Sequence, residues 1–216
     1  MSEGPCPRPG PAPAGAPDIP ALVASRICHD LINPLGAIGN GVELLSLDRA
    51  APSAELALVA ESVTNASARL RFFRIAFGHA RADQPTQPGE IAPILADLGR
   101  GGRVAYGWNV LGSVSRTDAK LAFLAILCLE TALPYGGTIA ATRDASGWRI
   151  AALGRGLRYE SNIWTPLRRA GAALPPGEMT GLLPAHVQFA LFTQEALAQD
   201  RRIALDLGES EGVVRF

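Results

Sequence analysis

Apolar residues recur with helical spacing in the first part of the chain. Between residues 24 and 45 they alternate at spacings of four and three, which is typical of a helix that packs along another helix. The pattern predicts one long helix that begins at Ile19 or Pro20 and ends at Leu47. The members of this seam are Ala24, Cys28, Leu31, Leu35, Ile38, Val42 and Leu45.

A second seam of the same kind follows a short connection at residues 48–52. It predicts a helix that begins near Ser53, and two long helices joined by a few residues form an antiparallel hairpin. The members of the second seam are Leu56, Val59, Val63, Ala66, Leu70, Phe73 and Phe77.

The pattern changes after a stretch rich in proline and glutamine at residues 84–89, which we interpret as a linker. Helices interspersed with hairpin-linked strands then predict an α/β sandwich. The expected helices lie near residues 91–98, 117–133 and 184–199. Strands are expected within residues 103–114 and at residues 137–143, 147–153, 202–207 and 212–216.

The fold class is therefore α + α/β, with a helical hairpin at residues 19–83 and an α/β domain at residues 90–216. A lone hairpin leaves large apolar side chains such as Ile27, Leu58 and Phe72 in need of cover. We expect two chains to pair into a four-helix bundle, as a homodimer. The alternative, in which the C-terminal half covers the hairpin within one chain, stays open.

Composition narrows the class of protein. The 216 residues are 48% hydrophobic and 19% charged, as in globular proteins. The formal net charge is zero, so no overall positive field favours nucleic acid or a membrane surface. The basic run formed by Arg69, Arg71, Arg74 and Arg81 is interpreted as a solvated face or as interhelical ion pairs.

Targeting and redox signals are few. No apolar run approaches the roughly 20 residues that span a bilayer, and residues 1–18, rich in proline, glycine and alanine, are expected to form a disordered leader. The three cysteines are far apart and lack metal-ligand spacing. We therefore expect neither a disulfide framework nor a zinc site, and a cytoplasmic location.

One polar cluster interrupts the first helical pattern. Residues 26–38 read RICHDLINPLGAI, with a histidine, an adjacent carboxylate, an asparagine one turn later and a proline that removes one backbone hydrogen bond. His29 falls off the seam, so we expect it to face water. The neighbouring residues on this face are small or polar, so a partner can reach His29. We predict that Arg26, Gly36, Ala37 and Asn40 contact this partner.

Residues 29–35 resemble the H box of bacterial histidine kinases and dimeric histidine phosphotransferases. The resemblance implies that His29 accepts a phosphoryl group. Asp30 would hold or deprotonate one ring nitrogen, and Asn33 would steady the ring or bond to the partner. An imidazole is largely neutral at cytoplasmic pH, so one ring nitrogen is a nucleophile without special activation.

The C-terminal half is similar to the Bergerat ATP-binding domain of histidine kinases, but its ligand residues are missing. Leu124 and Cys128 stand where that family has asparagines that hold Mg²⁺, and Ala152 replaces the aspartate before a Gly-x-Gly pair. Residues 181–184 lead straight into the last helix, without a glycine-rich lid. We therefore expect a degenerate domain, and no cofactor or metal bound by this chain.

The combination of an H box and a degenerate ATP-binding domain resembles the ChpT-type phosphotransferases. The resemblance implies that His29 takes a phosphoryl group from the receiver of a CckA-like hybrid kinase and passes it to CtrA-like and CpdR-like regulators. The receiver would supply Mg²⁺. Two alternatives stay open, namely a non-catalytic scaffold that binds receivers and a diverged autokinase.

Overall fold

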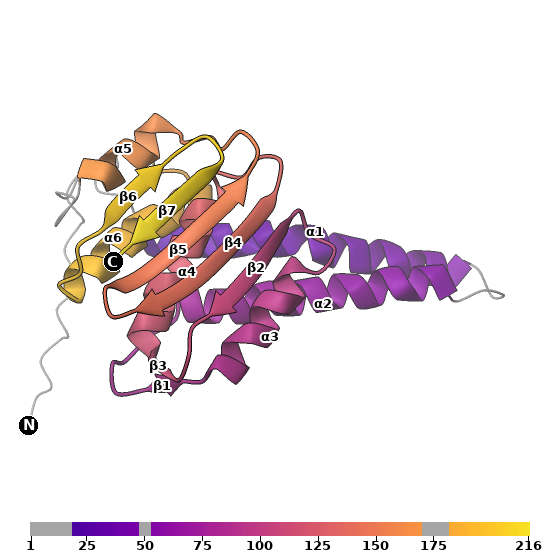
Figure 1. Ribbon diagram of the computed structural model, residues 1–216. Coiled ribbons are helices and arrows are strands. Elements are labelled where there is room, and N and C mark those ends of the chain that lie inside the picture. Colours follow the sequence, from indigo (N-terminus) through magenta and orange to yellow (C-terminus); the bar gives the residue numbers. More distant parts are fainter. Residues whose placement is uncertain (1–18, 48–52, 170–181) are drawn as a thin grey trace, which may run out of the picture.

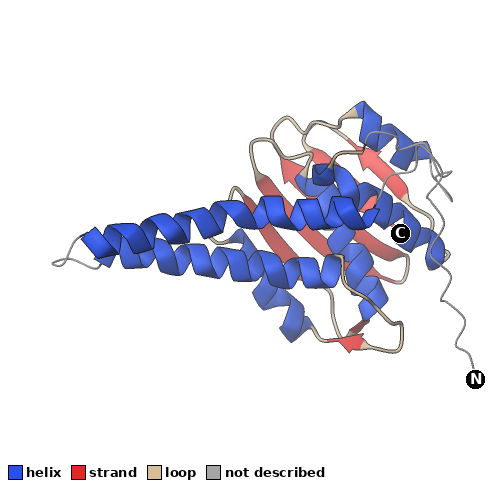
Figure 2. Cartoon of the chain, turned by 180° about the vertical axis from the view of Figure 1, so that it is seen from behind, coloured by secondary structure: helices blue, strands red, loops and turns tan. Residues whose placement is uncertain are grey.

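The computed structural model describes residues 19–47, 53–169 and 182–216. Figures 1 and 2 show it from opposite sides. The predicted leader at residues 1–18 and the connection at residues 48–52 lie outside the described residues. So does Gly181, the first residue of the segment in which a lid was expected to be missing.

The first two elements are the predicted helices. α1 (Ile19–Leu47) and α2 (Ser53–Ala76) run antiparallel, and one end of the pair extends away from the rest of the molecule (Figures 1 and 2). α1 continues through Pro34. The heptad pattern thus identified both helices correctly.

The C-terminal half contains a five-stranded sheet in the order β2-β4-β5-β7-β6, in which only β2 and β4 are parallel. α4 and α6 lie between this sheet and the hairpin (Figures 1 and 2). The main elements are α3 (Pro88–Gly99), β2 (Val104–Asn109), α4 (Arg116–Glu130), β4 (Gly137–Asp144), β5 (Gly147–Gly154), α5 (Ser161–Arg169), η1 (Pro184–His186), α6 (Val187–Ala198), β6 (Ala204–Leu207) and β7 (Glu211–Arg215).

Local signals explain several of these boundaries. The hydroxyl of Ser115 accepts a hydrogen bond of 3.0 Å from the backbone N–H of Asp118 and caps α4.

The predicted linker, in contrast, has regular structure. β1 (Pro85–Thr86) pairs with β3 (Val114–Ser115), and α3 already begins at Pro88. Residues 161–169, where no helix was predicted, form α5.

The hairpin and the α/β domain share one hydrophobic core. Phe72, at the end of α2, is fully buried and packs against Phe123 of α4, whereas Leu58 stays 43% exposed. The C-terminal half therefore covers part of the hairpin, as the alternative interpretation required, and leaves another part open to solvent. Within the described part of the chain, no helix is long and apolar enough to cross a membrane.

Candidate functional site

His29 stands on the outer face of α1. Its side chain is 77% exposed, and Nδ1 lies 3.0 Å from Oδ1 of Asp30. In the tautomer that carries its proton on Nδ1, the ring donates this hydrogen bond and Nε2 keeps its lone pair. The predicted exposure of His29 is confirmed, and the geometry presents one ring nitrogen to a partner.

Asp30 is held from two sides. Its second oxygen, Oδ2, accepts a hydrogen bond of 3.0 Å from Nε of Arg26, one turn earlier on the same helix. Both side chains are shielded, with 13% of Arg26 and 12% of Asp30 exposed. Charge-assisted bonds of this kind are stronger than neutral ones. The carboxylate is thus oriented toward His29.

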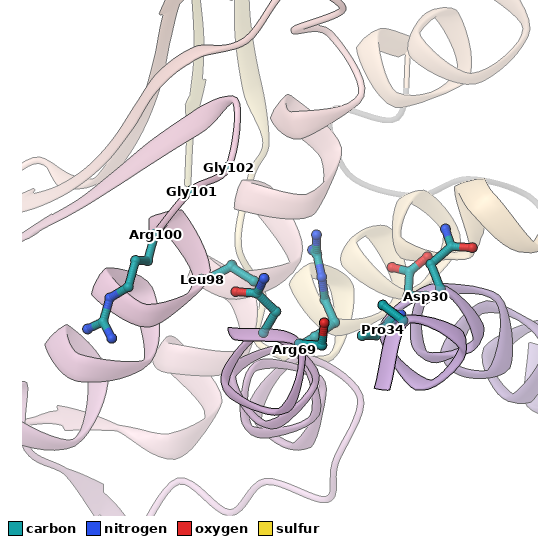
Figure 3. Close-up of a pocket in the computed structure, with 11 residues that line it drawn as sticks. Asp30, Pro34, Arg69, Leu98, Arg100, Gly101 and Gly102 are labelled. Carbon is teal, nitrogen blue, oxygen red and sulfur yellow. The ribbon is translucent and has the colours of Figure 1, made fainter. Parts of the chain in front are cut away.

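A cavity of about 400 Å³ opens beside Asp30. Figure 3 shows Asp30 and Pro34 on one side of it, Arg69 near the middle, and the segment from Leu98 to Gly102 on the other side. Both domains therefore line the space next to the H box. The lining residues are Asp30, Asn33, Pro34, Ala37, Ser62, Asn65, Arg69, Leu98, Arg100, Gly101 and Gly102.

Arg69 links this cavity to a second one of about 300 Å³. Its Nη1 lies 3.4 Å from Oε1 of Glu130, the last residue of α4. Burial lowers the pKa of Arg69, but Glu130, Tyr106 and Asp30 together raise it above its ordinary value. Burial, followed by the charge of Glu130, raises the pKa of the Tyr106 phenol. No pattern in the sequence indicated this interdomain ion pair.

Other arginines of the basic run are also paired within the chain. Arg71 lies 2.6 Å from Asp97, and Arg81 lies 2.6 Å from Asp83. Interhelical ion pairing therefore describes Arg71, because Asp97 belongs to α3, whereas Arg81 pairs outside the helices and remains 67% exposed.

The remaining predicted site residues lie along α1. Asn33, Gly36 and Asn40 are exposed and Ala37 is half-buried, so all four flank His29 on the same helix. Arg26 differs, because its side chain is shielded and bonded within the chain. A contact between these residues and a partner stays a prediction.

The positions that diverge from the ATP-binding domain lie in tight packing. Leu124 and Cys128 are fully buried in α4, and burial raises the pKa of the Cys128 thiol. Gly154 belongs to the Gly-x-Gly pair, which this chain retains. A Cβ on it would lie 2.5 Å from Cδ2 of Leu133, so close packing accounts for this glycine. The described residues contain no group of three or more His, Cys, Asp or Glu side chains that could hold a metal ion.

Comparisons with known proteins show the family of this chain. Residues 88–211 match the family described as histidine phosphotransferase C-terminal domain. Over 140 residues, the chain is 38% identical to protein phosphotransferase ChpT of Brucella abortus (strain 2308), an alignment that covers 63% of this chain and 66% of that protein.

One solved structure has a similar arrangement. The structure of a bacterial phosphotransferase at 1.7 Å is 30% identical, with a TM-score of 0.74, and the match covers 91% of this chain and 94% of that one. Histidine kinase AdeS of Acinetobacter baumannii matches with 10% identity and a TM-score of 0.40, over 86% of this chain and 94% of that one. Because the family match spans more than half of the chain, the protein belongs to the family of ChpT-type histidine phosphotransferases.

Proposed function

We propose that this protein is the carrier of a phosphorelay, in which His29 takes a phosphoryl group from one receiver domain and passes it to another. The observation that supports this most directly is an exposed imidazole whose Nδ1 is held by a carboxylate, on a chain of this family. Phosphoryl transfer depends mainly on positioning and charge neutralisation, which a fixed histidine can provide.

The proposed transfer is a single displacement at phosphorus. Nε2 of His29 attacks the aspartyl phosphate, so an N–P bond forms while the O–P bond to the receiver aspartate breaks and the carboxylate leaves. The ring then carries a positive charge and its Nδ1 proton, which Asp30 stabilises at 3.0 Å. The reverse displacement delivers the group to the next receiver.

We assign supporting roles to the neighbours of His29. Asp30 orients the ring, and Asn33 bonds to the incoming receiver from the same exposed side of α1. Gly36, Ala37 and Asn40 form the rest of the proposed contact region. By resemblance, the partners are the receiver of a CckA-like hybrid kinase and CtrA-like and CpdR-like regulators, which meet the protein in the cytoplasm.

The receiver supplies Mg²⁺ in this proposal, and the chain itself uses neither ATP nor a metal. Leu124 and Cys128 support this view, because apolar and thiol side chains in a packed core are poor ligands for Mg²⁺. A diverged autokinase would need a different nucleotide site.

We also propose a homodimer. Four large apolar side chains of the hairpin, Leu35, Leu56, Val63 and Leu70, are between 46% and 58% exposed. The three on α2 are spaced seven residues apart and so lie on one face of that helix. A second hairpin packed on this face would complete a four-helix bundle.

The test is transfer from a pre-phosphorylated receiver domain without ATP. We expect acid-labile, base-stable phosphate on the wild type and none on His29→Gln. His79→Gln is the matched control, because His79 is also exposed but lies outside the hairpin helices. Receiver binding without labelling of the wild type would favour the scaffold, and labelling by ATP alone would favour the autokinase.

A further inference from the structure

Arg26 ties the phosphoacceptor helix to the C-terminal domain. Its Nε donates to Oδ2 of Asp30, and its Nη1 donates to the backbone carbonyl of Ala185 in η1. These two acceptors are far apart in the sequence and belong to different parts of the molecule. The planar, rigid guanidinium can hold both at once, which a lysine ammonium on a flexible stem does less well.

The carbonyl of Ala185 is itself held in place. Nε2 of Gln188, on α6, donates a hydrogen bond of 2.9 Å to it. Gln188 is fully buried, and within the described part of the chain its Oε1 has no hydrogen-bond partner. An unsatisfied buried oxygen destabilises the fold, so an apolar residue would suit this place better unless the bond to Ala185 matters.

These contacts form a continuous chain of bonds. Gln188 holds the Ala185 carbonyl, that carbonyl holds Arg26, and Arg26 holds Asp30. The remaining oxygen of Asp30 faces Nδ1 of His29. The orientation of the imidazole is therefore linked to the α/β domain through side chains that solvent hardly reaches.

A second arginine lies near the same carboxylate. Arg69 and Asp30 line the same cavity, and the charge of Asp30 is one of the causes that raise the pKa of Arg69. The hydrogen bond from Arg26 holds Asp30 on the side of His29.

We propose that Arg26 is a positioning residue for phosphoryl transfer, through which the C-terminal domain holds Asp30 against Nδ1 of His29. The reaction it serves is the proposed function above, on which this inference rests. Arg26 does not touch the phosphoryl group. It keeps the proton on Nδ1, and the lone pair on Nε2 is thereby ready for attack.

The first experiment measures the His29 tautomer directly, by ¹⁵N NMR of the ring nitrogens in the full chain. The wild type should populate mainly the Nδ1–H form, and Arg26→Met should lose this bias while Arg26→Lys keeps part of it. Arg81→Met is the matched control, because it removes an arginine from the exposed ion pair with Asp83. An unchanged tautomer in Arg26→Met would overturn the proposal.

The second experiment measures the rate of transfer from a phosphorylated receiver. We expect Arg26→Met to slow it on the order of 10- to 100-fold, and Arg81→Met to leave it unchanged. Because Arg26 acts through Asp30, the double variant with Asp30→Asn should be no slower than the slower single variant. If the rate losses of the two single variants multiply in the double variant, Arg26 acts independently of Asp30, and the inference is overturned.

Gln188→Met separates positioning from folding. This substitution should slow transfer by a smaller factor than Arg26→Met does. In the double variant with Arg26→Met it should cause no further slowing, whereas a general loss of stability would slow transfer further. Thermal unfolding of each variant provides the check on folding. If the wild type accepts no phosphoryl group at all, the proposed function fails, while the tautomer result still decides whether Arg26 orients His29.

Discussion

Phe72 of α2 lies against Phe123 of α4, with ring centroids 4.5 Å apart and both rings fully buried. The contact joins the helical hairpin to the α/β domain. Phe73 and Ile75 of α2 belong to the same core cluster. The hairpin and the domain therefore share one core, although their sequence patterns differ, and we expect them to unfold together.

Truncation of Phe72 should destabilise the whole protein. Phe72→Ala removes a buried ring and leaves a cavity, which typically costs about 3–5 kcal/mol. Urea denaturation followed by tryptophan fluorescence and by helix circular dichroism should show one transition at a lower midpoint for both signals. Leu111→Ala, at a side chain that is 97% exposed, should change stability by less than about 0.5 kcal/mol. A transition of the helices that separates from that of the sheet would contradict a shared core.

Alanine substitutions at two glycines should change the stability of the protein in opposite directions. Gly137 has φ +153°, and a Cβ there would lie 2.1 Å from the carbonyl oxygen of Leu153, so Gly137→Ala must push β4 and β5 apart. We expect a loss of about 1–3 kcal/mol. Gly89, in the first turn of α3, has open space around it, and Gly89→Ala should stabilise by about 0.4–1 kcal/mol. Thermal unfolding of both variants tests this, and a neutral Gly137→Ala would refute the close approach.

A charge on the exposed face of α2 should break the proposed dimer. Val63 is 46% exposed on the face it shares with Leu56 and Leu70, and burying a glutamate there without a partner is unfavourable. Light scattering should give a dimer mass for the wild type and for Leu111→Glu, and a monomer mass for Val63→Glu. A monomeric wild type would refute the proposed dimer, and a dimeric Val63→Glu would place the interface elsewhere.

His186 should make stability depend on pH. Burial is the main cause that lowers its pKa, Glu160 acts in the opposite direction, and the positive charge of Arg26 lowers it further. The unfolded chain therefore binds a proton more readily, so this contribution to stability is complete above the unfolded pKa of about 6.5 and is lost as the pH falls below it. When the pH is lowered from 7.5 to 5.5, the unfolding midpoint of the wild type should fall more than that of His186→Gln.

The charges near His186 predict that two substitutions shift its pKa in opposite directions, which an NMR titration can measure. Arg26→Met removes a positive charge and should raise the pKa of His186, whereas Glu160→Gln removes a negative charge and should lower it. Shifts in the same direction would show that rearrangement, rather than charge, dominates.

Local pattern was enough for most of the helices and strands and for the exposure of His29. The heptad spacing predicted both hairpin helices, and it placed His29 off the apolar seam, where its side chain is indeed exposed. Ser115 caps α4 through the backbone N–H of Asp118, three residues later. These features depend on neighbours within one or two helical turns, which is the range over which sequence spacing fixes geometry.

The sequence alone determined that the hairpin carries an apolar seam, but not what covers each of its members. Phe73 is buried in the core of the α/β domain, while Leu70 remains 54% exposed, because hydrophobic burial has no direction and accepts any apolar partner. Only the tertiary structure brought Arg26 to the Ala185 carbonyl, 159 residues away, and Arg69 to Glu130, 61 residues away. Such contacts depend on how whole elements pack, and no local spacing encodes that.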